Sequence, residues 1–414
     1  MNLEVLTIGT ELLLGYTLDT NGAQIGRILS ACGIRVVRRT TVSDREPEIR
    51  AAFTDALART GTVLATGGLG PTRDDVTKRV VAELFDAPLE FDEGVWRSLV
   101  ERFERMGRKI SPTNRCQAEV PRGATVLPNR WGTAPGLWLE GPAGLAVLLP
   151  GVPREMHHLL EQEVAPRLAS RGTGRVIRSR TIRTTGIAES QLAEVLDGVE
   201  SGLEPLTLAY LPGFEGVDLR LTAWDLAPDA ADRLLADGAE RLRARAEAWI
   251  YGEGEDDLAA VVLERLRARG HHLAVGESCT GGMLGERITA VPGSSDVFVG
   301  GVIAYDNRVK ESDLGVAPII IAEHGAVSEP VARALAEGAA KRFGVDAAIS
   351  ITGIAGPAGG TPGKPVGTVC FGVCYRGSTA TRRAVLPGDR QEIRQRAAQT
   401  GLYLLYRVLT GSVG

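Results

Sequence analysis

The first 85 residues alternate between apolar strands and amphipathic helices, and this alternation limits the fold more than any other feature of the chain. Strands are predicted at residues 3–8, 34–42 and 62–66, and helices at residues 20–33, 46–60 and 74–85. Strands separated by helices pair in parallel, because each helix returns the chain to the same edge of the sheet. We therefore predict an α/β fold, with a parallel sheet covered by helices on both faces.

Polar clusters follow the three predicted strands, in the sequences GTELLLG, TVSDRE and TGGLGPTRDD. Ligands of such sheets bind beyond the carboxyl ends of the strands, so we expect one binding edge here. In the third cluster Gly67, Gly68 and Gly70 allow close approach to the backbone, and the N–H groups that begin the next helix favour an anion. The pattern is neither a Walker loop nor GxGxxG, but it predicts a phosphate cradle.

Asp74 and Asp75 follow these glycines and are expected in the first turn of the helix. One interpretation is that they only cap the helix. The other is that a divalent metal bridges them to the phosphate, because carboxylates alone would repel it.

The length of 414 residues is too great for one ordinary core, and we expect domains at residues 1–171, 172–252 and 253–414. The middle domain is predicted to be α+β, with a strand, a short helix, a hairpin around PGFEG and a longer helix. In the third domain strands and helices alternate again, and its last helix is expected to begin after the N-cap Asp389.

Composition narrows the possible functions. The net charge of −4 argues against broad nucleic-acid binding, and no apolar run approaches the ~20 residues of a membrane span. Five scattered cysteines favour a reducing, cytoplasmic environment, with Cys370 and Cys374 expected in the core. Adjacent histidines, as at 157–158 and 271–272, do not share a helix face or a side of a strand, which argues against a histidine zinc site.

The sequence GESCTGG in the third domain follows the predicted strand HHLAV and places Ser278, Cys279 and Thr280 in a row. A hydroxyl in this position could cap a helix. However, Gly281 and Gly282 each cost a helix ~1 kcal/mol, and they would let a ligand approach an oxyanion hole made by the turn. From the residues alone, a helix cap and a catalytic turn are both open.

A serine nucleophile needs a base. His324 in EHGAVSE is one candidate, which could equally face solvent. The alternative is a lysine whose pKa is lowered by burial, and AYDNRVK offers Tyr305 and Lys310 just beyond a strand end. Periodicity alone does not separate these roles from a surface lysine and a strand-end aromatic residue.

Longer motifs carry a resemblance that covers essentially the whole chain. They are IGTELLLG, DTNGAQIG, TGGLGPTRDDVT, SPTNRCQAEVPRGATVLPNRWGTAPG, LPGVPREM, RTTGIAESQLAE, GESCTGG and TGIAGPAGGTPGKPVGTV. Together they resemble the CinA (competence/damage-inducible protein) family. The resemblance implies an N-terminal MoCF-like three-layer α/β/α domain, a KH-like α+β module and a C-terminal α/β deamidase domain.

For the N-terminal domain, the resemblance implies an ADP-ribose pyrophosphatase that forms AMP and ribose 5-phosphate with Mg, Mn or Co. Asp75 matches the signature aspartate of MoCF-like domains and Asp44 their second acidic position, so both are expected to hold the metal. The three glycines of the cradle would bind the pyrophosphate, and Glu11 and Asn21 are further candidates from neighbouring strand ends.

For the C-terminal domain, the resemblance implies a nicotinamide mononucleotide (NMN) deamidase without a cofactor, which releases nicotinic acid mononucleotide and ammonia. Ser278 would be the nucleophile and Lys310 its base, while Tyr305 would orient the lysine or relay a proton. The expected substrate-binding residues are Thr280, Gly281, Gly282, Thr352 and Gly353.

The two residues that follow Ser278 are less favoured as the nucleophile. Cys279 is intrinsically a better nucleophile, but it has no visible histidine partner. Thr280 is expected to cap the following helix.

The resemblance makes the middle module KH-like, yet its residues do not favour RNA. Its only GxxG sequence, Gly213–Gly216, falls between two predicted strands, and Glu215 would repel a phosphate. Five arginines between Arg171 and Arg183 are interpreted as a solvated face. We expect a spacer or dimerisation element in a homodimer, and no nucleic-acid partner.

Three functions follow from these observations. The first is a bifunctional enzyme of pyridine-nucleotide salvage, because NMN and ADP-ribose are both products of NAD breakdown. The second is an accessory protein in DNA uptake or damage response that binds nucleotides or proteins without catalysis, and the third is a molybdopterin-cofactor enzyme. The intact set of Ser278, Tyr305 and Lys310 favours the first.

Overall fold

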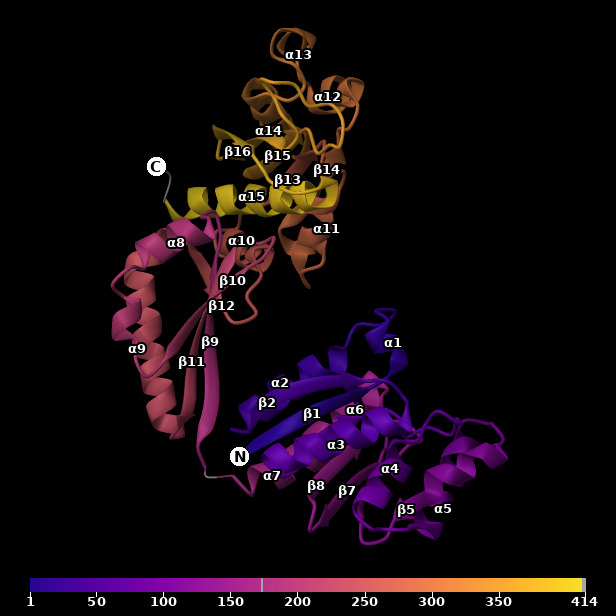
Figure 1. Cartoon of the computed structure of the whole chain (residues 1–414). Coiled ribbons are helices and arrows are strands. Elements are labelled where there is room, and N and C mark those ends of the chain that lie inside the picture. Colours follow the sequence, from indigo (N-terminus) through magenta and orange to yellow (C-terminus); the bar gives the residue numbers. More distant parts are fainter. Residues whose placement is uncertain (173, 412–414) are drawn as a thin grey trace. The chain divides into compact units, whose positions relative to one another are not determined.

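The computed structural model describes residues 1–172 and 174–411 and contains two compact units (Figure 1). The first unit comprises Met1–Arg178 and Ala223–Leu234, and the second comprises Ser179–Thr222 and Leu235–Gly414. Within the described ranges, no helix is both long and apolar enough to cross a membrane.

The first unit is built on a six-stranded sheet in the order β2-β1-β3-β8-β7-β6. Its strands are β1 (Asn2–Ile8), β2 (Arg35–Val42), β3 (Thr62–Thr66), β6 (Thr125–Leu127), β7 (Gly136–Gly141) and β8 (Gly144–Leu149). The predicted parallel pairing is confirmed for β1, β2 and β3. β8 also pairs in parallel with β3, whereas the β8–β7 and β7–β6 pairs are antiparallel. Only two residues join β7 to β8, too few for the crossover that parallel strands need.

Helices cover both faces of this sheet, as predicted. On one face, α3 (Glu46–Thr60) and α4 (Thr77–Leu84) pack Phe53 and Val80 against Leu6 of β1. On the other, α2 (Thr20–Ala31) and α6 (Pro153–Leu159) pack against Val5. The remaining elements are α1 (Thr10–Leu13), α5 (Glu93–Arg105), α7 (Ala165–Ala169) and the β4 (Leu89–Phe91) and β5 (Glu119–Pro121) pair.

The middle module has the predicted elements and one additional strand. Its sheet has the order β10-β11-β9-β12. The strands are β9 (Val176–Thr184), β10 (Thr207–Pro212), β11 (Val217–Leu226) and β12 (Ile250–Glu253), and the helices are α8 (Glu189–Val195) and α9 (Pro228–Ala246). The sequence GFEG forms the predicted hairpin loop between β10 and β11.

The rest of the second unit contains a five-stranded sheet in the order β14-β13-β15-β16-β17. Its strands are β13 (Leu273–Glu277), β14 (Phe298–Ile303), β15 (Ala347–Gly353), β16 (Thr368–Tyr375) and β17 (Ser378–Val385). β13 pairs in parallel with β14 and β15, and β16 and β17 follow in antiparallel.

Two helical layers enclose this sheet. One contains α10 (Leu258–Arg267), α11 (Met283–Thr289) and α15 (Arg390–Thr410), and the other α12 (Asn307–Leu314), α13 (Pro318–His324) and α14 (Glu329–Phe343). Asp389 caps α15 in a capping box with Glu392, as predicted. Cys370 and Cys374 are buried free thiols, which confirms their expected place in the core.

Candidate functional sites

The candidate site of the first unit lies where its strand order reverses. β1 lies between β2 and β3. The chain crosses from β1 through α2 to β2 on one side, and then through α3 to β3 on the other side of β1. Such a switch point opens a crevice at the carboxyl ends of the strands. The strands end level with one another, because Ile8 pairs with Val42 and Thr7 with Thr66. The loops after β1, β2 and β3 therefore meet at this edge.

The glycines after β3 are required by backbone packing as well as by any ligand. Gly67 has φ 109°, and a Cβ on it would lie 2.2 Å from the carbonyl oxygen of Ile8. Gly68 has φ 68°, and its Cβ would lie 2.0 Å from Thr77 Oγ1. At Gly70 the Cβ would lie 2.5 Å from Asp75 Oδ2. The loop is thus pressed against β1 and α4, which holds its backbone in one place.

Asp44 and Asp75 each accept two hydrogen bonds through one oxygen. Asp44 Oδ2 accepts from the Thr10 N–H at 2.7 Å and Thr10 Oγ1 at 2.9 Å. Asp75 Oδ2 accepts from the Thr72 N–H at 2.8 Å and Thr72 Oγ1 at 2.5 Å. Among the described residues, neither Oδ1 atom has a hydrogen-bond partner, so each carboxylate keeps one oxygen for a ligand.

The expected position of Asp74 and Asp75 in the first turn of the helix is wrong. α4 begins at Thr77, after a turn over residues 72–75 that the Asp75 carboxylate closes. This turn uses the short side chain of Asp75 to bind a backbone N–H three residues earlier, and it delays the start of the helix. The two aspartates are therefore loop residues rather than helix caps.

The free Oδ1 atoms of these carboxylates are of the type that binds divalent metals. The described residues contain no group of three or more His, Cys, Asp or Glu side chains able to hold an ion by themselves. Magnesium is commonly bound by only one or two carboxylates together with substrate phosphates. The strands β2 and β3 are about 10 Å apart across β1, and the bonds to Thr10 bring Asp44 inward toward β1.

The two weaker candidates differ in their surroundings. Glu11 is exposed, and its carboxylate folds back over Gly9, where a Cβ would lie 2.5 Å from Oε1. Asn21 is buried, and its Nδ2 donates to Thr66 Oγ1 at 3.2 Å and to the Gly151 carbonyl at 2.8 Å. Its Oδ1 is buried and has no partner among the described residues.

Sequence reasoning missed Lys78 at this site. Its Nζ donates to the Cys116 carbonyl, and burial lowers the pKa of Lys78 while the nearby charges of Cys116, Glu119 and Asp75 raise it. Asp75 and Lys78 are three residues apart, a spacing that could have drawn attention to the lysine.

The candidate site of the second unit begins at the carboxyl end of β13. The Ser278 N–H donates to the Ile351 carbonyl at 2.8 Å, and the serine is only 8% exposed. Glu277, which precedes it, is buried and accepts N–H bonds from Gly282 at 3.0 Å, Leu284 at 3.1 Å and Gly285 at 2.8 Å. A carboxylate therefore satisfies the N-terminus of α11.

This arrangement overturns the expectation that Thr280 caps the helix. The N-cap position is Gly282, which has φ 95° and no side chain to offer, and Glu277 supplies the acceptor instead. The Thr280 hydroxyl is fully buried without a hydrogen-bond partner in the described part of the chain. Thr280 thus remains part of the turn but does not cap the helix.

The turn leaves two neighbouring N–H groups for an oxyanion. Ser278 donates to Ile351, Gly281 to the Ser278 carbonyl and Met283 to the Thr280 carbonyl. Across residues 1–172 and 174–411, no acceptor is found for the N–H groups of Cys279 and Thr280. An oxyanion hole formed by the residue after a nucleophile is a recurring catalytic device.

Lys310 lies beside this turn. It is 1% exposed, and Nζ donates to the carbonyls of Ala304 at 2.8 Å and Tyr305 at 3.1 Å. The Ala304 N–H in turn donates to the Glu277 carbonyl at 2.6 Å, which brings the lysine to the strand end that carries Ser278. Burial lowers the pKa of Lys310, and the charges of Asp306 and Cys279 raise it.

Tyr305 contributes its carbonyl to the lysine, while its side chain turns elsewhere. The ring is 59% exposed, and its hydroxyl accepts from Arg390 at 3.0 Å. Arg390 also donates to the Gly356 carbonyl at 2.6 Å, and Arg394 donates to the Thr280 carbonyl at 2.7 Å. Sequence reasoning missed both arginines, which lie on one face of α15 at a spacing of four residues.

The remaining predicted residues surround the same turn. Thr352 is buried and donates its hydroxyl to the Ala326 carbonyl at 2.8 Å. A Cβ on Gly353 would lie 3.0 Å from Cys279 Sγ, so this glycine leaves room for the thiol. Burial raises the pKa of Cys279 to about 12, which disfavours a reactive thiolate.

His324 ends α13 with an exposed side chain, and its carbonyl accepts from Lys364 at 2.9 Å. No hydrogen bond connects its ring to Ser278 within the described ranges. Of the two candidate bases, Lys310 is the one that the fold buries next to the turn.

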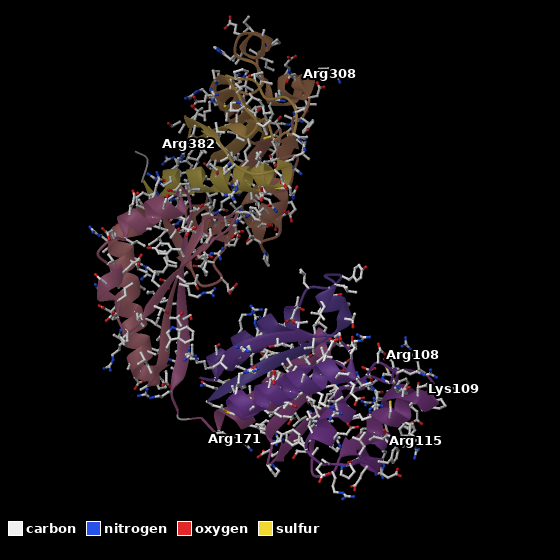
Figure 2. The ribbon with its side chains drawn as sticks, in the orientation of Figure 1. Arg108, Lys109, Arg115, Arg171, Arg308 and Arg382 are labelled. Atoms are coloured by element: carbon white, nitrogen blue, oxygen red, sulfur yellow. The ribbon has the colours of Figure 1, made fainter. Side chains whose placement is uncertain are left out.

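The arginines between residues 171 and 183 are paired with carboxylates rather than simply solvated. The pairs are Arg171–Glu140, Arg175–Asp225, Arg178–Asp232, Arg180–Glu253 and Arg183–Asp218 (Arg171 is labelled in Figure 2). The positive charge of this stretch is therefore largely compensated.

Comparisons with known proteins agree with this architecture. Family models match at residues 4–170 ("Probable molybdopterin binding domain"), 179–252 ("Damage-inducible protein CinA KH domain") and 255–409 ("CinA C-terminal domain"). A CinA-like protein of Gemmatimonas aurantiaca is 53% identical over 418 residues, covering 100% of this chain and 98% of the relative.

The chain belongs to the CinA family.

Other CinA relatives extend over the same length. A CinA-like protein of Dictyoglomus turgidum is 42% identical and covers 99% of both chains. Among solved structures, the competence damage-inducible protein A (ComA) of Klebsiella pneumoniae is 36% identical, covering 37% of this chain and 95% of its own, with a TM-score of 0.36.

Proposed function

We propose that the second unit of this CinA protein hydrolyses the carboxamide of NMN. Ser278 Oγ attacks the amide carbon while neutral Lys310 takes the hydroxyl proton, and the N–H groups of Cys279 and Thr280 stabilise the oxyanion. Lys310 then returns the proton to the departing amine, which leaves as ammonia. Water attacks the resulting ester while Lys310 accepts its proton, and Lys310 then passes that proton to the departing Ser278 Oγ. This step releases nicotinic acid mononucleotide and restores neutral Lys310 and Ser278.

The observation that carries this proposal is the burial of Lys310 against the strand end that bears Ser278. A lysine acts as a base only when neutral, and burial favours that form. The carbonyl of Tyr305 orients the amine, whereas its phenol is exposed and accepts a hydrogen bond from Arg390. Arg390, Arg394 and the loop after Thr352 supply donors for the nucleotide phosphate.

The test of this proposal is Ser278→Ala in the full chain. We expect ammonia release from NMN to fall by at least about a thousandfold, because loss of the nucleophile removes the covalent route. Ser312→Ala is a matched control, since this serine of α12 is exposed and donates its hydroxyl to its neighbour Asp313. Equal activity of the two variants would refute the role of Ser278.

For the first unit we propose an ADP-ribose pyrophosphatase that yields AMP and ribose 5-phosphate. A bound divalent metal would neutralise the pyrophosphate and lower the pKa of a water molecule. Asp44 and Asp75 would hold it through their free Oδ1 atoms, and the glycine loop would bind the phosphates through its backbone. Glu11 in α1, and Asn21 in α2 beside Thr66 at the end of β3, remain the further candidates for binding the sugars.

Asp75→Asn tests this second proposal, because asparagine can still accept the Thr72 bonds but carries no charge. We expect ADP-ribose cleavage to fall by about a hundredfold or more, since metal stabilisation is worth several kcal/mol. Asp74→Asn is the control at the adjacent exposed position. An equal loss in both variants would argue against a metal ligand at Asp75.

For assembly we propose a homodimer. Four large apolar side chains are exposed in the segment after β1, namely Leu13, Leu14, Tyr16 and Leu18. Exposed apolar patches commonly mark protein interfaces. A molar mass of two chains in light scattering is the expected result, and a mass of one chain would contradict it.

A further inference from the structure

The hairpin loop of the middle module binds the deamidase part of the same unit. We call residues Gly213–Gly216 the GFEG loop. Glu215 Oε1 accepts from Arg287 of α11 at 3.0 Å, and Glu215 Oε2 accepts from Arg183 of β9 at 2.6 Å. The Glu215 carbonyl accepts from Gln399 of α15 at 2.7 Å. One residue of the loop thus joins a strand of its own module to two helices beyond it.

The GFEG loop is held firmly in this position. Gly216 has φ 151°, and a Cβ on it would lie 1.9 Å from the carbonyl oxygen of Thr184, so the loop packs directly on the end of β9. Gln399 is buried and also donates to Thr185 Oγ1 at 3.2 Å. The contact therefore includes backbone packing and buried hydrogen bonds as well as ion pairs.

The ion pairs form a partly buried network. The side chain of Arg287 is 16% exposed and also binds Asp257, the N-cap of α10, at 3.0 Å. Isolated surface pairs contribute little, whereas networks with limited exposure contribute more. Glu215 is thus one of two carboxylates that fix Arg287, and through it the position of α11.

Both helices that the loop contacts carry parts of the candidate site. The first turn of α11 binds the carboxylate of Glu277, whose neighbour is Ser278. α15 carries Arg390 and Arg394, which bind Tyr305 and the Thr280 carbonyl. A displacement of α11 relative to β13 would move the Ser278 turn away from Lys310.

We propose that the middle module acts as a positioning element for the deamidase site, with Glu215 as its positioning residue. This inference rests on the proposed NMN deamidase function. In a KH domain that binds RNA, the GxxG loop clamps the nucleic-acid backbone. Here the GFEG loop is engaged by Arg287, Arg183 and Gln399, so its contacts are made within the chain.

Glu215→Gln in the full-length protein tests the proposal, because the variant keeps the side-chain length but loses the charge. We expect kcat for NMN to fall about 5- to 20-fold with KM within about twofold, since a small misplacement of a nucleophile costs up to about 100-fold. Glu255→Gln is the control, an exposed glutamate two residues before Asp257 that makes no hydrogen bond or ion pair to α11 within residues 1–172 and 174–411. Its kinetics should match the parent protein.

Two further variants separate positioning from general stability. Glu215→Asp keeps the charge and should recover part of the lost kcat. On an Arg287→Gln background, Glu215→Gln should add less than twofold, because the two residues act through one contact. Full additivity of the two losses, or no rescue by aspartate, would overturn the proposal.

Hydrogen exchange gives a readout that does not depend on NMN. Backbone amides of residues 279–289 should exchange faster in Glu215→Gln than in Glu255→Gln, while those of α14 stay unchanged. Faster exchange in a protein that releases no ammonia from NMN would keep the positioning role and reject the proposed activity. Equal exchange and equal kcat in the two variants would reject the positioning role itself.

Discussion

The two candidate sites differ in the sign and the burial of their charged side chains. In the first unit, partly exposed carboxylates lie in loops at the edge of the sheet, each with one oxygen bound to a threonine and the other free. In the second unit, a lysine and a serine are almost completely buried at a strand end. Exposed acids need a cation before they can act on a phosphate, whereas a buried amine is already biased toward the neutral form of a base. The difference predicts one metal-dependent reaction and one that needs no metal.

Removal of divalent metal is expected to have the largest effect, and it should affect the activity of the first site but not that of the second. A chelator should abolish AMP formation from ADP-ribose, and Mg, Mn or Co should restore it, because the cation offsets the negative charges of Asp44, Asp75 and the pyrophosphate. Ammonia release from NMN should be unchanged in the same sample. Loss of both activities on chelation would contradict the prediction that only the first site needs a metal.

Replacement of Lys310 should have the next largest effect, on the second site alone. Lys310→Met should lower kcat/KM for NMN by about 100- to 10,000-fold, the usual contribution of a general base. Lys310→Arg should not restore activity, since arginine stays protonated. ADP-ribose cleavage by both variants should equal that of the parent protein, and a parallel loss there would point to misfolding.

The lowered pKa of Lys310 also sets a pH dependence. A pKa depressed by folding means that the unfolded chain binds the extra proton, so stability rises with pH between the folded and unfolded values. Relative to Lys310→Met, which has no amine to titrate, the parent protein should therefore gain stability as the pH rises toward 10.5. In the parent, kcat/KM should rise as pH passes through the folded pKa of Lys310. A difference in melting temperature between the two proteins that does not change with pH would contradict a lowered pKa of Lys310.

Glu277→Gln should have a smaller, structural effect. Glutamine can replace only one of the two carboxylate oxygens that accept the N–H groups of α11, and it loses the charge that favours a helix N-terminus. We expect a loss of about 2–3 kcal/mol in urea unfolding. Glu286→Gln, at an exposed position of the same helix, should change stability by less than about 0.5 kcal/mol.

Cys279→Ala should have the smallest effect. The thiol is buried with its pKa raised to about 12, so it is not a thiolate at neutral pH. We expect kcat for NMN within about threefold of the parent, together with a modest loss of stability from the lost packing. A loss comparable to that of Ser278→Ala would transfer the nucleophile to Cys279.

The strands and their parallel pairing could be predicted in part because local patterns determine them. The first three strands and helices alternate in the sequence, and the parallel pairing of β1, β2 and β3 follows from that alternation. The antiparallel β7 depends on a two-residue connection that apolar periodicity does not reveal. The late start of α4 depends on one side-chain bond of Asp75, which competes with the helix for the same residues.

The site residues could likewise be predicted only where a local sequence motif contains them. Ser278, Lys310 and the glycines belong to compact motifs, so their sequence neighbourhood identifies them. The role of Glu277 could not be predicted, because in the sequence it is simply the last residue of an apolar strand. The N–H groups that bind its carboxylate belong to α11, which packs over it only in the folded chain. Arg390 lies 85 residues from Tyr305 and Arg394 lies 114 residues from Thr280. Both belong to a helix that carries several other arginines and glutamines, so the sequence does not single them out.

The central claim is that Ser278 forms a covalent bond to the substrate without a metal. Mass spectrometry of the chelator-treated protein, acid-quenched during turnover of NMN, measures this directly. The account predicts that the peptide containing Ser278 gains the mass of the nicotinate mononucleotide acyl group, and that Lys310→Met and Ser278→Ala do not accumulate it. An adduct on Cys279, or NMN turnover that requires added metal, would contradict the account.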